Sequence, residues 1–224
     1  AEWAAQRVQG LSLVRAILSA TSLQRRAVTI KSLIERFRYP RLGPGQMWET
    51  AADKVVELGG RVLMSHRVDS FELEDGLVRA VVVDTPNGSM RVEGDHFINT
   101  VPLRNLVRSL DPPAPEDVAA AAERLAYRDF ILVALILDKP RLFPDNWIYV
   151  HTPGVLVGRI QNFNNWSAAM VPQEGMTCLG MEYFCFKGDG MWTMADEDLV
   201  ALATEELDRL GLAAGAKVVD GSVV

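Results

Sequence analysis

Arg159 lies in an unusual environment for a charged side chain. It belongs to the segment VLVGRIQNF, residues 155–163, in which most side chains are apolar and whose pattern is typical of a strand. A guanidinium inside an apolar strand costs free energy unless it is paired with a carboxylate, hydrogen-bonded or in contact with a ligand. Arg159 is therefore predicted either to form a structural ion pair or to face a ligand, and the sequence leaves both alternatives open.

Aromatic side chains form a second candidate surface, because Trp147 and Tyr149 alternate along a predicted strand and so share one of its faces. Such rings can form a platform for a sugar or a base, but they also pack well in a hydrophobic core. His66, His96 and His151 are scattered over separate predicted strands. A metal site or a catalytic triad needs its side chains clustered, and so we predict neither.

The segment FRYPRLGPGQMWE, residues 37–49, contains a glycine-rich loop directly before a predicted helix that carries Trp48. Glycine is favoured where the backbone takes a positive φ or approaches another group closely. Gly43 and Gly45 could therefore bring the backbone close to a ligand. A Gly-x-Gly pair before a helix is also common without any ligand, so this spacing alone does not distinguish a binding loop from a simple helix start.

The hydrophobic periodicity predicts helices and strands in an order typical of an α+β (mixed α/β) fold. The predicted helices cover residues 3–20, 47–58, 103–110, 115–127 and 196–210. The predicted strands cover residues 61–68, 69–73, 77–84, 90–93, 96–101, 130–137, 147–150, 155–162 and 177–186, and a last strand begins after Gly211. The eight apolar residues FILVALIL at 130–137 predict a fully buried strand.

The composition is that of an ordinary globular protein, with 224 residues of which 49% are hydrophobic. The net charge of −6 argues against nucleic-acid binding, which needs a basic face. Cys178 and Cys185 match no CxxC pattern, and so we expect reduced cysteines and a cytoplasmic protein. No apolar run reaches the roughly 18 residues that a transmembrane helix requires. The first residue is Ala1 and helical periodicity begins at once, and so we expect a fragment of a longer protein.

A series of short motifs in a fixed order resembles the flavin-containing amine oxidase superfamily, which also includes protoporphyrinogen oxidase, phytoene desaturase and UDP-galactopyranose mutase. The motifs are Tyr39-Pro40, Gly43, Gly45, Gly59-Gly60, Arg61-Val62, Val68 and Thr100-Val101-Pro102. The resemblance is good over residues 37–102 and looser over the rest. It implies FAD as the cofactor, a substrate domain with a mixed sheet and helices, and an antiparallel β-meander that belongs to the FAD domain. The cofactor-binding positions it implies are Gly43, Gly45, Val68, Thr100 and Pro102.

A narrower resemblance is to UDP-galactopyranose mutases of the eukaryotic type. The matching segments are Trp3 with Arg7, Arg38-Tyr39-Pro40 with Trp48, Trp147-Ile148-Tyr149, Arg159, and Asn164-Asn165-Trp166-Ser167. In that branch arginines contact the pyrophosphate of the nucleotide sugar, since a guanidinium binds phosphate oxygens in pairs. The substrate-binding positions implied are Arg7, Arg38, Trp48, Tyr149, Arg159, Asn165 and Trp166.

Two positions depart from the mutase pattern. Trp166 stands where the mutases have a tyrosine, and Ile34 stands where they have an asparagine that faces the substrate. The implied substrate can therefore differ from that of the mutases. Arg7 also has an ordinary interpretation as a solvated helix residue, because arginine is mostly exposed in proteins.

The resemblance implies three segments, which are a helical part of the substrate domain at 1–36, an FAD-associated loop, helix and meander at 37–110, and substrate-domain strands and helices at 111–224. It leaves three functions open. The first is a mutase-like enzyme acting on a nucleotide sugar. The second is an FAD-dependent oxidoreductase of the protoporphyrinogen oxidase, amine oxidase or desaturase type with an apolar or amine substrate. The third is a non-catalytic binding domain.

Further expectations concern cofactor retention and assembly. The chain contains no G-x-G-x-x-G sequence after a strand, and so we expect the 224 residues alone to be inactive and not to retain FAD. Residues 61–102 are expected to form a three-stranded meander flanked by strands without their natural partners. Such edges could pair two copies into a homodimer. The guanidinium of Arg159 is expected to point into the largest cleft, beside Tyr149 and the loop 43–45.

Overall fold

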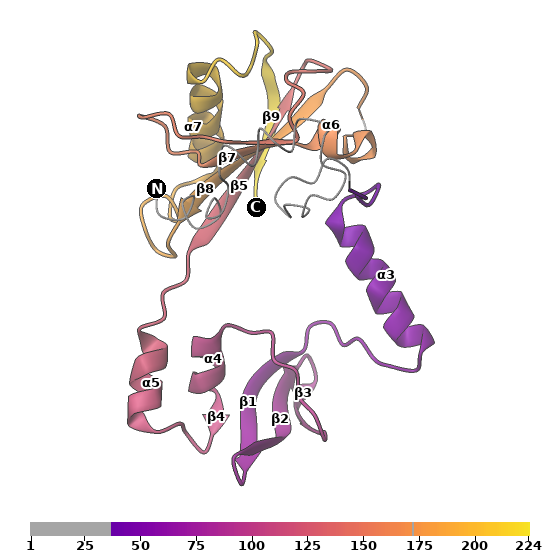
Figure 1. Cartoon of the computed structure of the whole chain (residues 1–224), viewed down its shortest axis with the longest axis vertical. Coiled ribbons are helices and arrows are strands. Elements are labelled where there is room, and N and C mark those ends of the chain that lie inside the picture. The colour runs from indigo at the N-terminus through magenta and orange to yellow at the C-terminus, as the bar shows by residue number, and fades with distance from the viewer. Residues whose placement is uncertain (1–36, 172) are drawn as a thin grey trace, which may run out of the picture. The chain divides into compact units, whose positions relative to one another are not determined.

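The computed structural model describes residues 37–171 and 173–224, which form two β-sheets and five α-helices of at least four residues (Figure 1). The described residues contain both helices and strands, and the fold class is α+β, as predicted. The predicted helical segment at 1–36, with Arg7 and Ile34, lies outside the described residues. No helix in the described part of the chain has the length and apolar character needed to cross a membrane.

Helix α3 (Pro44–Glu57) follows the glycine-rich loop, as the sequence predicts, but begins three residues earlier than predicted. Gly43 is its N-terminal flanking residue, and Pro44 occupies the first turn, where a missing N–H costs little. The helix ends at Glu57, and Gly59 just beyond it takes a φ of +86°, which stops the helical path. None of its side chains is buried, and Met47, Trp48 and Val56 are each at least half exposed.

The first sheet has the strand order β3-β2-β1-β4. Strands β1 (Arg67–Glu74), β2 (Leu77–Thr85) and β3 (Gly88–Glu93) form an antiparallel meander, while the short β4 (Leu110–Asp111) pairs parallel with β1. A small core of Phe71, Val81 and Val83 lies on one face. The predicted three-stranded meander is therefore confirmed.

The prediction of a strand on either side of the meander is wrong. Residues 61–66 and 96–101 have no strand conformation, although their apolar character is typical of strands. A strand needs a neighbour to take its backbone hydrogen bonds, and no described strand pairs with these segments. Ile98 is 94% exposed, whereas its neighbour Phe97 packs against the small core of this sheet.

Two helices follow the meander. Helix α4 (Leu103–Arg108) begins directly after Pro102, and α5 (Glu116–Glu123) begins directly after Pro115. Both are shorter than predicted. The Arg108 guanidinium forms a two-pronged ion pair with Glu123 and so connects the ends of the two helices.

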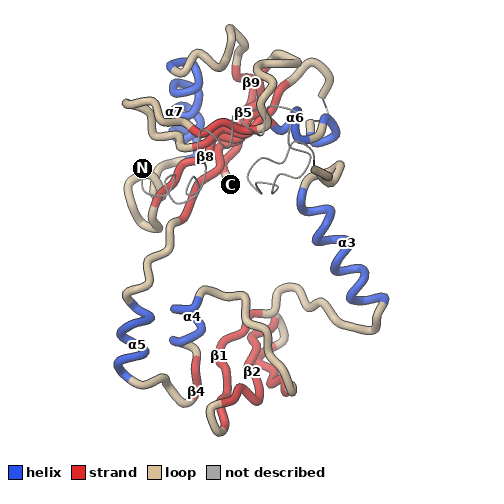
Figure 2. The backbone as a smooth tube through the Cα atoms, in the orientation of Figure 1, coloured by secondary structure: helices blue, strands red, loops and turns tan. Residues whose placement is uncertain are grey.

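The second sheet has the order β6-β7-β8-β5-β9 and is antiparallel at every described pairing, rather than mixed as expected for the substrate domain. Its strands are β5 (Asp129–Leu137), β6 (Trp147–Tyr149), β7 (Arg159–Asn162), β8 (Thr177–Cys185) and β9 (Val218–Val223). The short helices α6 (Phe163–Trp166) and η1 (Ala168–Met170) join β7 to β8, and α7 (Asp196–Arg209) joins β8 to β9 (Figure 2).

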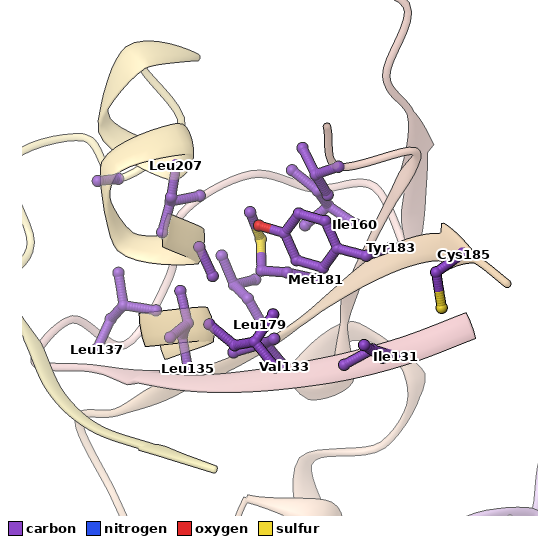
Figure 3. Packing of buried hydrophobic residues seen from close by; sticks show 14 residues of the cluster. Ile131, Val133, Leu135, Leu137, Ile160, Leu179, Met181, Tyr183, Cys185 and Leu207 are labelled. Carbon is purple, nitrogen blue, oxygen red and sulfur yellow. The ribbon is translucent and has the colours of Figure 1, made fainter. Parts of the chain in front are cut away.

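The main core lies between α7 and one face of this five-stranded sheet. Leu199, Ala203 and Leu207 of α7 belong to the same buried cluster as the inward side chains of β5, β7 and β8. Figure 3 shows Leu207 above Leu135 and Leu179, with Met181 and Tyr183 alongside. The three acidic residues in the first turn of α7 suit the positive end of the helix dipole.

The continuous apolar run FILVALIL predicted a fully buried strand. The structure buries only one face of this strand. Ile131, Val133, Leu135 and Leu137 are buried against α7, whereas Leu132, Ala134 and Ile136 are only half-buried and Phe130 is 54% exposed. The reason is that α7 covers one face of the sheet and the second face has no helix of comparable length in the described residues. Within the described residues, the apolar side chains on that second face are therefore left partly exposed.

Candidate functional site

The open face of the five-stranded sheet, meaning the face turned away from α7, carries the candidate residues Tyr149 and Arg159. Pairing in register aligns Tyr149, Arg159, Glu182 and Leu132 in one row across β6, β7, β8 and β5. The next row consists of Trp147, Gln161, Gly180 and Ala134. Strand alternation turns all eight residues toward the same face.

Arg159 forms an ion pair with Glu182, its direct cross-strand neighbour. The Nε of Arg159 donates to Oε2 of Glu182 at 2.6 Å, and its Nη2 contacts the same oxygen. Glu182 is almost completely buried, with 2% of its side chain exposed, whereas 27% of the Arg159 side chain remains exposed. Of the two alternatives predicted for Arg159, the structure shows the ion pair.

Glu182 has a second partner, since its Oε1 accepts a hydrogen bond from the Gln161 amide. Both oxygens of this buried carboxylate are therefore satisfied, as a buried charge requires. Burial opposes the charge on Arg159 most strongly, but hydrogen bonding and attraction to Glu182, with a further contribution from Tyr149, outweigh it and raise the pKa of Arg159. The guanidinium carbon lies 5.9 Å from the centre of the Tyr149 ring, within cation–π range.

Aromatic rings gather beside this ion pair. Trp166 of α6 stacks on Tyr39 with 4.9 Å between ring centroids and contacts Trp147 at 5.0 Å. Burial raises the pKa of the Tyr39 hydroxyl. Trp147 and Tyr149 are 46% and 37% exposed, so they are surface rings and not core residues. The structure thus joins residues from three distant segments into one aromatic cluster, made up of Tyr39, Trp147, Tyr149 and Trp166.

The glycine-rich loop packs against the residues that follow α6. Ser167 Oγ donates a hydrogen bond of 2.6 Å to the Arg41 carbonyl oxygen, and a Cβ on Gly43 would lie 3.3 Å from Cε of Met170. Gly43 takes φ +88° and ψ 178°, a combination available almost only to glycine. Gly45 has open space where a Cβ would stand, and so nothing in the described structure explains why glycine is needed there.

Asn165 holds a neighbouring loop in place. Its Nδ2 donates to the carbonyl oxygens of Phe143 at 2.8 Å and Asp145 at 2.9 Å. Asn165 also lines an open hollow of about 680 Å³, together with residues of the segment 140–144. Arg159 does not line this hollow, and its expected place in the largest cleft stays a prediction.

Two further predicted substrate residues, Arg38 and Trp48, lie within the described residues. Arg38 is exposed, and Trp48 on α3 is 68% exposed with no described contact to the aromatic cluster. The open face also carries Cys178, a free thiol whose pKa burial raises to about 11. A thiol with such a pKa stays protonated at neutral pH, and so Cys178 is unsuited to nucleophilic catalysis. In the described part of the chain no cluster of His, Cys, Asp or Glu is suited to a metal ion.

A second hollow, of about 430 Å³, brings together two of the predicted cofactor segments. Val68 at the start of β1 and Val101, between Thr100 and Pro102, both line it, along with Arg67 and Arg108. Strand β4 pairs with β1 only from Phe71 onward, and so the edge of β1 at Val68 has no neighbour on this side in the described residues. Thr100 and Pro102 lie outside any strand, and Pro102 precedes α4.

Sequence reasoning missed Glu182 and Gln161. Glu182 was visible as the one charged residue in the apolar segment TCLGMEYFC of β8. Its partner could not be identified, because Arg159 lies 23 residues away and only the register of β7 against β8 brings the two together.

The sequence from residue 14 to residue 222 matches the model of the family described as flavin containing amine oxidoreductase. No curated protein has a significant match. The fold is similar to solved structures of a reduced UDP-galactopyranose mutase (18% identity, TM-score 0.64), a protein of an Exiguobacterium species assigned as a protoporphyrinogen oxidase (17%, 0.60) and a putrescine oxidase bound to putrescine (19%, 0.56). These matches cover 84%, 81% and 81% of this chain, but only 39%, 38% and 38% of the other chains.

Proposed function

Because the chain belongs to the flavin-containing amine oxidoreductase family, we propose that it supplies the substrate-facing portion of an FAD-dependent enzyme. In this proposal residues 37–110 accompany the FAD domain, and residues 1–36 and 111–224 belong to the substrate domain. The open face of the five-stranded sheet is the surface that meets the substrate. Its exposed apolar and aromatic side chains, set around one ion pair, support this assignment.

The described residues fit part of an FAD site. The free edge of β1 at Val68 offers backbone groups, and the adjoining hollow of about 430 Å³ lies beside Val101. We assign the adenine end of the cofactor to this edge, with Thr100 and Pro102 nearby and the backbone of Gly43 and Gly45 toward the flavin. Bound FAD would supply the redox or nucleophilic chemistry, while the residues of this chain bind and orient the substrate.

Within that framework we propose a mutase-like activity on a nucleotide sugar. The observation that carries it is Arg159, a partly exposed guanidinium on the open face beside the aromatic cluster. Its remaining N–H groups can donate to a phosphate oxygen. The rings of Tyr149 and Trp166 can flank the ligand, and Asn165 keeps the loop at Phe143 in place. Arg7, Arg38 and Trp48 remain further candidates for substrate contact.

A second candidate function rests on a different observation. Glu182 neutralises Arg159, and the same face presents Phe130 and Phe184, which are 54% and 40% exposed. A neutral surface with exposed apolar rings also suits an apolar or amine substrate and an oxidoreductase reaction. The two candidates differ in whether Arg159 contributes to binding of a phosphate group.

The deciding experiment is a calorimetric titration of UDP into the flavin-loaded protein that contains this chain, as wild type and as Arg159→Ala. The substitution should weaken UDP binding by about 1.5–3 kcal/mol, the range for hydrogen bonds to charged groups. Flavin content should stay unchanged, because Arg159 is assigned to the substrate. Arg91→Ala is a matched control, since Arg91 is paired with Glu72 on the other sheet.

An intermediate loss is expected for Arg159→Lys, which keeps the charge but loses the planar fork. Equal UDP affinity in wild type and Arg159→Ala, or no UDP binding by the wild type, would favour the oxidoreductase with an apolar or amine substrate. A preparation of the longer protein that never retains flavin would instead favour the non-catalytic binding domain.

A further inference from the structure

We propose that Glu182 determines the charge specificity of the open face by holding Arg159 in place and cancelling its charge, and so limits the affinity for an anionic ligand. This inference rests on the proposed function. Glu182 acts through Arg159 and is a positioning residue, since its 2% exposure leaves almost no surface for direct contact with a ligand.

The geometry of the cluster fixes the guanidinium from one side. Glu182 Oε2 takes the N–H of Nε and contacts Nη2, and Gln161 holds the other carboxylate oxygen. The Nε–Nη2 edge of Arg159, which could otherwise grip two phosphate oxygens, is therefore occupied within the protein. A ligand on the open face meets only the remaining N–H groups of the guanidinium.

The charges around Arg159 also indicate a limited affinity for an anionic ligand. The two rows around the ion pair contain Tyr149, Trp147, Gln161, Gly180, Leu132 and Ala134, none of which carries a charge at neutral pH. Glu182 is thus the only charged side chain that faces Arg159 within these described rows. An anion that binds Arg159 must also lie within several ångströms of the Glu182 carboxylate, and the repulsion offsets part of the attraction.

Weakened anion binding is useful to an enzyme that acts on the sugar portion of its ligand. Affinity that is equal for substrate, transition state and product does not accelerate the chemical step. A neutralised arginine can orient the phosphate without holding the nucleotide so tightly that release becomes slow. The same pair would also discriminate against free multiply charged anions, which have no sugar or base to add contacts.

The test is the UDP titration performed on Glu182→Gln in the flavin-loaded protein, at several salt concentrations. The amide keeps the shape of the side chain and an oxygen acceptor for Arg159. We expect UDP to bind about tenfold tighter at low salt, the order expected when one nearby like charge is removed. The gain should shrink as salt rises, because screening weakens charge effects. Glu205→Gln is the matched control, since Glu205 lies on α7 and its side chain is 68% exposed.

A second variant should change the UDP affinity in the opposite direction. Gln161→Glu adds a carboxylate at a half-buried position and should weaken UDP binding by about tenfold. It keeps the inference testable if Glu182→Gln does not fold, and unchanged or tighter binding by Gln161→Glu would then overturn it. Where Glu182→Gln does fold, UDP affinity equal to or weaker than that of the wild type overturns the inference alone. No UDP binding by the wild type overturns the proposed function as well.

Discussion

Gly43 and Gly45 belong to one short motif, but the structure gives them different roles. Gly43 takes a backbone conformation that other residues rarely adopt, and it packs close to Met170. Gly45 lies in the first turn of α3 with open space around it. The glycine at position 43 is therefore explained by the fold of this chain. The glycine at 45 remains a candidate for contact with the cofactor.

Gly43→Ala should lower the free energy of unfolding by about 1–3 kcal/mol, the cost of forcing an ordinary residue into a glycine-only conformation. Gly45→Ala should leave the free energy of unfolding unchanged or raise it by up to about 1 kcal/mol, because alanine favours a helix. Urea unfolding followed by tryptophan fluorescence measures both. Equal destabilisation by the two substitutions would contradict this assignment. A loss of flavin binding by Gly45→Ala, without loss of stability, would support its assignment to the cofactor.

At the scale of elements, α7 orients the loop that leads into β7. Glu206 on α7 is buried, and its carboxylate accepts the backbone N–H groups of Leu156, at 2.5 Å, and Val157, at 3.0 Å. Arg209 donates a hydrogen bond of 2.6 Å to the Gly154 carbonyl oxygen. This loop enters β7 directly before Arg159. The helix on the closed side of the sheet therefore helps to place the candidate residue on the open side.

Glu206→Gln should lower the free energy of unfolding by about 1–3 kcal/mol. The amide has one oxygen acceptor for two N–H donors, of which that of Val157 is buried, and an unsatisfied buried donor costs about that much. Glu205→Gln, one residue away, should cost at most about 0.5 kcal/mol, because Glu205 forms only an exposed pair with Arg209 on the helix surface. Thermal and urea unfolding distinguish the two variants. Similar losses would show that the buried hydrogen bonds of Glu206 add little.

At the scale of the whole molecule, acid stability depends on carboxylates whose pKa values folding lowers. Hydrogen bonds from the backbone N–H groups of Phe186 and Trp192 lower the pKa of Asp189 below its ordinary value of 3.8. The hydrogen bond from Arg67 lowers the pKa of Asp84, and that from Arg108 lowers the pKa of Glu123. A lowered pKa in the folded state means that the stabilisation is fully present above the unfolded value and is lost as the pH falls through the folded value.

The thermal unfolding midpoint should therefore be constant near neutral pH and begin to fall as the pH drops below about 4.5, the highest ordinary value among these carboxyls. Asp189→Asn should have a lower midpoint than the wild type at pH 6, because its amide can accept only one of the two hydrogen bonds fully. The difference should narrow as the pH falls below 3.8. A constant difference between the two proteins down to pH 2 would show that Asp189 does not contribute to acid unfolding.

Cofactor retention is also a property of the whole molecule. The 224-residue chain contains the free edge at Val68 but no G-x-G-x-x-G loop for the FAD diphosphate. We expect the purified chain to be colourless and a protein that contains it together with such a loop to carry flavin. The absorbance spectrum of each preparation measures this directly. A yellow 224-residue chain would mean that FAD binds through residues other than those assigned above.

Local patterns in the sequence were sufficient for most individual elements. Turn residues such as Asp75-Gly76 separate β1 from β2, and the amphipathic period over 196–209 marks α7. These features depend on neighbouring residues, so a single sequence contains them. The order of the glycine and proline motifs likewise indicated the flavin amine oxidase superfamily, and the family match confirms it.

Contacts between distant segments were decided only by the tertiary structure. Whether residues 61–66 and 96–101 become strands depends on a neighbouring strand, and no local pattern reveals whether one is present. The cross-strand register pairs Arg159 with Glu182, and the packing of the loop against α6 and η1 brings Tyr39 to Trp166 and Gly43 to Met170. The sequence by itself determined that Arg159 needed a partner, because a buried charge is costly. Only the fold decided which carboxylate satisfies it, because register and packing depend on the whole sheet.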